Sequence, residues 1–69
     1  MSEQEKIVEY LQLKYGTYLL DKDQVAVEAG KISSTSVDRL RQTGALSSRK
    51  VLGQVRFSVT EVARFIADA

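Results

Sequence analysis

The apolar residues near the N-terminus of this 69-residue chain recur with the spacing of one helix face. This stripe predicts a helix over residues 3–15. Gly16 follows it and suits the left-handed conformation that ends many helices. The next residues, 17–20, are β-prone and predict one short edge strand. The stripe itself consists of Ile7, Val8, Leu11 and Tyr15.

A second helix is predicted over residues 22–29. Asp21 precedes it, and Gln24 stands three residues later, which is the spacing of a capping box. Gly30 then ends the helix. Its predicted apolar face consists of Val25, Ala26 and Ala29.

A third helix is predicted over residues 34–43, because Ser33 or Ser34 can cap it and Gly44 can stop it. Its inward side is predicted to carry Val37 and Leu40. Arg41 falls on a flank of this helix. Its exposed face is predicted to carry Thr35, Asp38, Arg39 and Gln42.

A β-hairpin is predicted after the third helix, with Gly53 in its turn. Inward-facing residues are predicted to be Val51, Val55 and Phe57, and outward-facing ones Lys50, Gln54 and Arg56. A two-residue loop of Gly53 and Gln54 would place residues of opposite parity on one face. We therefore expect a loop of three or five residues, or a bulge.

The last helix is predicted to follow a capping box formed by Ser58 and Glu61. Its core residues are predicted to be Val62, Phe65 and Ile66. The complete order of elements, α-β-α-α-β-β-α, predicts a single α+β domain over 1–69, with residues 1–16 as an additional N-terminal helix. The two central helices and the hairpin together indicate a small winged helix-turn-helix, in which helices pack on a β-hairpin wing. The edge strand can extend this hairpin to a three-stranded sheet.

The net charge is only +1, but the charged residues are unevenly distributed. Residues 31–56 contain six basic side chains and Asp38 as the only acid, a net +5, whereas residues 1–30 carry −3 and residues 57–69 carry −1. A basic block that coincides with a helix and a hairpin is typical of a nucleic-acid-binding surface. Ordinary solvated surface charge is the alternative interpretation.

The sequence contains no cysteine and no histidine, so it lacks disulfides, cysteine-based zinc sites and the usual general base. No nucleophile, base and orienting group form a recognisable set. We therefore expect no enzymatic activity, no metal and no cofactor. The sequence also lacks a long apolar run and an N-terminal signal segment, so we expect a cytoplasmic protein without a membrane span.

From Leu20 onward the chain resembles the excisionase and MerR-type winged-helix DNA-binding families. The segments that carry the resemblance are LDKDQVAVEAG, TSVDRL, TGAL, VLGQVRF and SVTEVARFI, in that order. The chain departs from the family pattern in three ways. The turn between Gly30 and Val37 is one residue longer, Asp38 replaces an aromatic or basic residue, and residues 1–16 are additional.

The resemblance implies sequence-specific binding of double-stranded DNA, as an excisionase-like recombination directionality factor or a small transcriptional regulator of a phage, plasmid or integrating element. It places Arg39 at the recognition-helix arginine, and Arg56 and Gln54 in the wing. Together with the helix geometry, it suggests base contacts by Thr35, Arg39 and Gln42, with Asp38 as a further candidate. Backbone contacts are expected from Lys31, Ser33, Ser34 and Arg41, and wing contacts from Arg49, Lys50, Gln54 and Arg56.

A second hypothesis is a protein-interaction module on a winged-helix scaffold. The acidic first helix, with Tyr10 and Leu13 outside its apolar stripe, could dock an integrase, another recombinase, a polymerase or a second copy of the chain. Because no long helix follows the closing helix, we expect a monomer or a weak homo-oligomer on DNA.

Overall fold

The computed structural model describes residues 2–68. Met1 and Ala69, which the predicted domain includes, lie outside this range. Within residues 2–68 the chain forms four helices and a three-stranded antiparallel sheet. The predicted α+β class is therefore confirmed.

Helix α1 spans Glu3–Tyr15, as predicted. Ser2 caps it, because the Ser2 hydroxyl accepts a hydrogen bond from the Glu5 backbone N–H at 3.2 Å and the Glu5 carboxylate accepts one from the Ser2 N–H. Gly16 ends the helix with a φ of 66°, a conformation that glycine adopts without steric cost.

Helix α2 spans Lys22–Glu28 and begins with the predicted capping box. The Asp21 carboxylate accepts from the Gln24 N–H at 2.8 Å, and the Gln24 side chain accepts from the Asp21 N–H at 3.0 Å. The helix ends one residue earlier than predicted, because Ala29 is its C-terminal cap.

Helix α3 spans Ser34–Gln42, with Ser33 as its N-terminal cap and Thr43 as its C-terminal cap. The turn from α2 contains two successive left-handed residues, Gly30 at φ 106° and Lys31 at φ 61°. These two residues form the tight turn between α2 and α3, which pack against each other.

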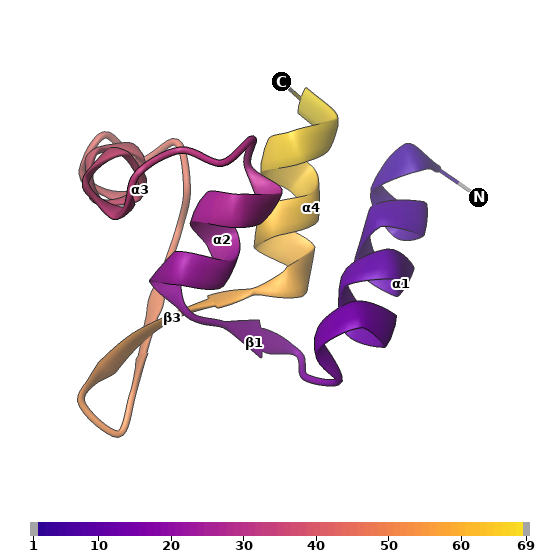
Figure 1. Cartoon of the computed structure of the whole chain (residues 1–69), viewed down its shortest axis with the longest axis horizontal. Coiled ribbons are helices and arrows are strands. Elements are labelled where there is room, and N and C mark those ends of the chain that lie inside the picture. The colour runs from indigo at the N-terminus through magenta and orange to yellow at the C-terminus, as the bar shows by residue number, and fades with distance from the viewer. Residues whose placement is uncertain (1, 69) are drawn as a thin grey trace.

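The sheet has strand β3, Gln54–Ser58, at its centre. Strand β2, Arg49–Val51, pairs with one edge of β3, and strand β1, Leu19–Leu20, pairs with the other edge. The three-stranded sheet is thus confirmed, and the predicted edge strand is confirmed for Leu19–Leu20 but not for residues 17 and 18. The β2–β3 hairpin extends beyond the helices at one end of the molecule (Figure 1).

The hairpin loop differs from the prediction. Val51 pairs directly with Gln54, so the loop contains only Leu52 and Gly53, both with positive φ (52° and 79°). Positive φ at both central residues matches the tight type I′ turn that fits the twist of two-residue hairpins. The predicted longer loop or bulge is wrong, because the turn consists of Leu52 and Gly53, one residue earlier than Gly53 and Gln54.

The shifted turn also changes which side chains share a face. Directly opposed residues lie on the same face of an antiparallel pair. Val51 therefore shares a face with Gln54 and is 38% exposed, rather than facing the core. Lys50 lies opposite Val55 on the other face, whereas Arg49 lies opposite Arg56.

Helix α4 spans Val59–Asp68 and follows β3 without a break. The Ser58 hydroxyl accepts from the Glu61 N–H at 3.2 Å, as one half of the predicted capping box requires. The Glu61 carboxylate instead accepts from the Ser47 N–H at 3.5 Å and pairs with Arg64.

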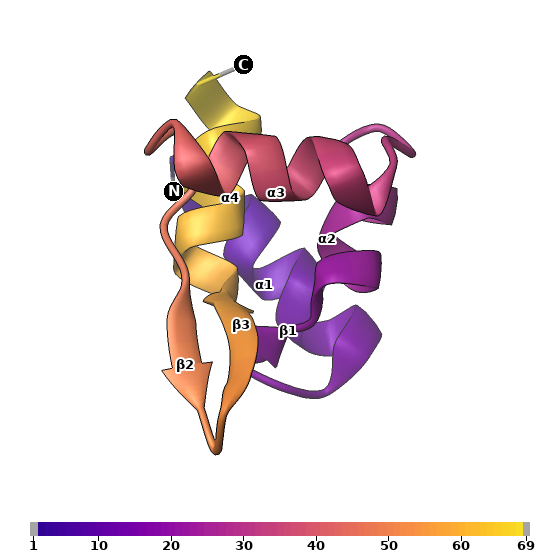
Figure 2. The same cartoon turned by 90° about the vertical axis from the view of Figure 1, so that its left-hand side faces the viewer.

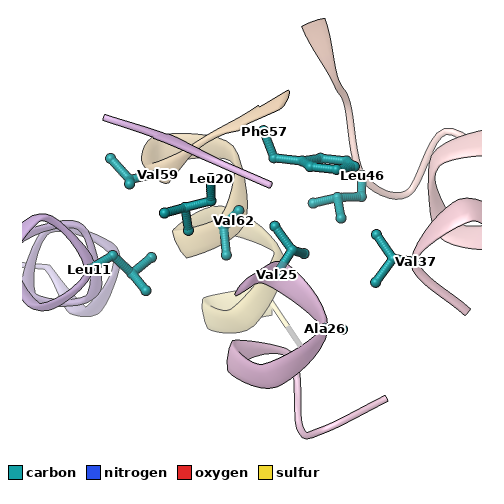
Figure 3. Close-up of a cluster of buried hydrophobic side chains, with 9 residues drawn as sticks. All are labelled: Leu11, Leu20, Val25, Ala26, Val37, Leu46, Phe57, Val59 and Val62. Carbon is teal, nitrogen blue, oxygen red and sulfur yellow. The ribbon is translucent and has the colours of Figure 1, made fainter. Parts of the chain in front are cut away.

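Side chains from all four helices and from strands β1 and β3 meet in one buried cluster (Figure 3). Phe57 at the centre of the sheet is fully buried, and so is Val37 on α3. Leu40, Phe65 and Ile66, predicted as core residues, are only partly buried around the cluster. The cluster consists of Leu11, Leu20, Val25, Ala26, Val37, Leu46, Phe57, Val59 and Val62.

The additional helix α1 is an integral part of this core. It packs along α4 (Figure 1), and Leu11 is fully buried. A polar contact also joins it to α2, because the Glu28 carboxylate accepts from Lys14 Nζ at 2.7 Å and from the Tyr15 hydroxyl at 2.6 Å. Burial raises the pKa of Glu28, but these hydrogen bonds outweigh it and the net pKa is lowered.

Candidate nucleic-acid interface

Helix α3 and the β2–β3 hairpin lie on the same face of the molecule, where Figure 2 shows the helix above the hairpin. Helix α1 lies on the opposite side of the molecule (Figure 1). Helix α3 and the hairpin, which carry most basic residues of the block 31–56, therefore lie on a different side from α1, which carries Glu3, Glu5 and Glu9.

Three of the four residues predicted on the outer face of α3 are exposed: Thr35, Arg39 and Gln42. They are spaced by four and three residues, so they follow one line along the helix. A hydroxyl, a guanidinium and an amide can all hydrogen-bond to base edges in a major groove. This line of side chains is the chemically distinctive feature of the outer face.

Asp38, the fourth predicted residue, pairs with neighbours instead of pointing freely outward. Its Oδ2 accepts from Lys22 Nζ at 3.0 Å, and its Oδ1 lies 3.6 Å from Arg41 Nη2. The hydrogen bond from Lys22 lowers the pKa of Asp38. Arg41, predicted on a flank, is accordingly paired with Asp38 on the same helix.

A groove of about 480 Å³ lies between the start of α2, helix α3 and strand β3. Carboxylates and cations both line it, so it is not a simple basic pocket. Its lining residues are Asp21, Lys22, Asp23, Ser34, Asp38, Arg41, Gln54, Val55 and Arg56.

The hairpin presents its predicted cations on two faces. Arg49 and Arg56 lie opposite each other and share a face with Gln54, whereas Lys50 is exposed on the other face. Arg56 donates to the Gln54 side chain and, at 3.2 Å, to the Val55 carbonyl. The Gln54 amide therefore orients Arg56. The sequence pattern also predicted these two side chains on the same face of the hairpin.

The start of α3 carries the remaining predicted residues. The Ser33 hydroxyl accepts from the Ser36 N–H at 3.2 Å, which confirms a capping role. Ser34 lines the groove, and Lys31 is exposed in the turn. These groups lie at the positive end of the α3 dipole, a position that favours an anion.

Sequence reasoning did not include Lys22 among the candidate site residues. Lys22 belongs to the acidic N-terminal part of the sequence, but in the structure it lies in the groove and contacts Asp38, sixteen residues away. No local signal in the sequence marks this contact, because it depends on the way α2 packs against α3.

Comparisons of this chain with protein-family models, with curated proteins and with solved structures each found no match. No helix within residues 2–68 is long and apolar enough to span a membrane.

Proposed function

We propose that this chain is a winged-helix protein that binds double-stranded DNA in a sequence-specific manner. The observation that carries the proposal is that helix α3, which bears the exposed Thr35, Arg39 and Gln42, lies on the same face of the molecule as the basic hairpin. In this proposal α3 enters the major groove and the hairpin contacts the adjacent backbone or minor groove.

The two parts of this surface contribute differently to binding. Arg39 can donate two hydrogen bonds to the O6 and N7 of guanine, which makes it the main candidate for reading sequence. The hairpin cations are not on a helix that enters the major groove, so they act through phosphates, which supply affinity without sequence information. These cations are Arg49, Lys50 and Arg56. Affinity should therefore depend on the hairpin, and specificity on α3.

The test starts with the selection of bound sequences from a pool of random duplexes. Arg39→Ala should then weaken binding to the selected site by about 1–3 kcal/mol, with relaxed preference at one base pair. Lys6→Ala is the control, because it removes an exposed cation from α1 on the other side of the molecule. Equal effects of the two variants, or failure to enrich any sequence, would contradict the proposal.

We propose that the biological role is that of an excisionase-like recombination directionality factor, or of a small transcriptional regulator, in a phage, plasmid or integrating element. Both roles use the same DNA surface, and DNA bending separates them. A strong bend in a gel assay with permuted site positions would favour the recombination role, whereas binding to straight DNA would favour simple repression.

The competing hypothesis is a protein-interaction module that uses α1. In its favour, Leu13 is 79% exposed and Tyr10 is 49% exposed. Tyr10 also has a local contact, because its hydroxyl accepts from Lys14 Nζ at 3.1 Å. This hypothesis predicts that a recombinase is captured in a manner that depends on Tyr10 and Leu13, while duplex binding is undetectable at low salt.

A further inference from the structure

Asp38 is the only acidic residue between residues 31 and 56, and it lies within the proposed DNA-binding surface. Its carboxylate bridges two cations that would otherwise be available to DNA, Lys22 on α2 and Arg41 on α3. All three side chains keep about a third of their surface exposed, with values of 32%, 38% and 35% respectively. They are therefore close enough to solvent for a phosphate to compete for the cations.

The hold on Arg41 is incomplete. The 3.6 Å separation between Arg41 Nη2 and Asp38 Oδ1 is longer than a hydrogen bond. Among the residues that the structure describes, Arg41 Nε and Asp38 Oδ1 are buried without a hydrogen-bond partner. Arg41 is thus held mainly by charge, and a change in the charge of Asp38 would release it.

The groove beside this cluster carries equal numbers of positive and negative side chains. Lys22, Arg41 and Arg56 face it together with Asp21, Asp23 and Asp38. Loss of the Asp38 charge would leave two cations without their counter-charge at the edge of the α3 surface. Each cation that neutralises a phosphate releases counterions, and this release drives binding to any sequence.

We propose that Asp38 is a specificity-determining residue, which restrains Lys22 and Arg41 from DNA phosphates and so limits binding to unrelated sequences. This inference rests on the proposed DNA-binding function. Because sequence preference depends on the difference between two affinities, suppression of the non-specific one raises discrimination without any added base contact.

The experiment measures the salt dependence of binding to a duplex of unrelated sequence and to the selected site. Asp38→Asn should tighten non-specific binding and steepen its slope of log K against log salt by about 0.9–1.8, as expected for one or two additional phosphate contacts. Asp23→Asn is the matched control, because Asp23 is exposed in the same groove and has no ion pair within residues 2–68. It should change the slope much less.

Two single variants of the chain that keeps Asp38 do not depend on the folding of Asp38→Asn, and a double variant combines Lys22→Met with Asp38→Asn. In the otherwise native chain, Lys22→Met should leave the slope nearly unchanged, because Asp38 already holds that cation. Arg49→Gln, which removes an exposed hairpin cation, should reduce the magnitude of the slope by about 0.9. In the Asp38→Asn background, Lys22→Met should reverse about half of the gained slope.

Equal slopes for Asp38→Asn and Asp23→Asn would overturn this inference and leave the proposed function intact. This inference would also be overturned if Lys22→Met reduces the magnitude of the slope as much as Arg49→Gln does. Weaker binding of Asp38→Asn to the selected site alone would also overturn it, since that result indicates a direct contact with cytosine. Absence of duplex binding by the native chain would refute the proposed function and this inference with it.

Discussion

Replacement of Leu11 by alanine tests whether the additional helix α1 is part of the folding unit. Leu11 is fully buried, with 0% of its surface accessible to solvent. Leucine-to-alanine changes at buried sites cost about 2–5 kcal/mol, because they remove apolar contacts and leave a cavity. A domain of this length has a total stability of roughly 3–10 kcal/mol. The change should therefore remove a large share of it.

The assay is urea unfolding followed by far-UV circular dichroism. With a slope of about 1 kcal/mol per molar urea, the midpoint of Leu11→Ala should fall by roughly 2 M or more, or the variant should be unfolded in buffer. Leu13→Ala is the matched control, since Leu13 is on the same helix and 79% exposed. It should change stability by no more than about 0.5 kcal/mol. Equal midpoints for the two variants would show that α1 is only loosely attached.

Three further predictions concern the polar contact between helices, the hairpin turn and helix α3. Because the pKa of Glu28 is lowered in the folded chain, its contribution to stability is present above its ordinary pKa of 4.5 and is lost as the pH falls through the folded value. Glu28→Gln should thus lower stability at neutral pH. When urea midpoints are measured at several pH values, the variant should lose less stability than the native chain on acidification. An equal loss in both would contradict this assignment. Leu52→Asn should raise the melting temperature by a few degrees, about 0.5–1 kcal/mol, because Leu52 is 99% exposed and asparagine tolerates its left-handed backbone better; a lower melting temperature would argue against the tight turn. Arg39→Ala should keep the native melting temperature while it loses affinity for the selected duplex, so a large loss of stability would indicate a structural role for Arg39 instead.

The helices were predictable from the sequence because local signals define them. Asp21 with Gln24 and the Ser33 cap act within three residues of their partners, and the structure contains both. The apolar spacing around Leu11 and Val37 likewise identified residues that are fully buried. Such features depend on neighbours along the chain, so a single sequence is enough to find them.

The hairpin register was not predictable, because alternation alone does not determine where a turn lies. Leucine rarely adopts positive φ, so nothing in the sequence marked Leu52 as a turn residue. A shift of one position then moved Val51 out of the core and separated Lys50 from Arg56. Turn position therefore controls which cations share a face of the hairpin.

Contacts between distant residues were also beyond sequence reasoning. Asp38 was identified as unusual, but its pairing with Lys22 depends on the two left-handed residues, Gly30 and Lys31, that fold α3 back onto α2. The contacts of Glu28 with Lys14 and Tyr15 likewise require the docked position of α1. Only the three-dimensional arrangement brings these groups together.

The most direct test of the central claim is the affinity of the native chain for duplex DNA, measured by fluorescence anisotropy over a range of salt concentrations. If about four phosphates are neutralised, log K should fall linearly with log salt with a slope of roughly −3.6. Binding whose affinity does not depend on salt, or no detectable binding at low salt, would contradict the account.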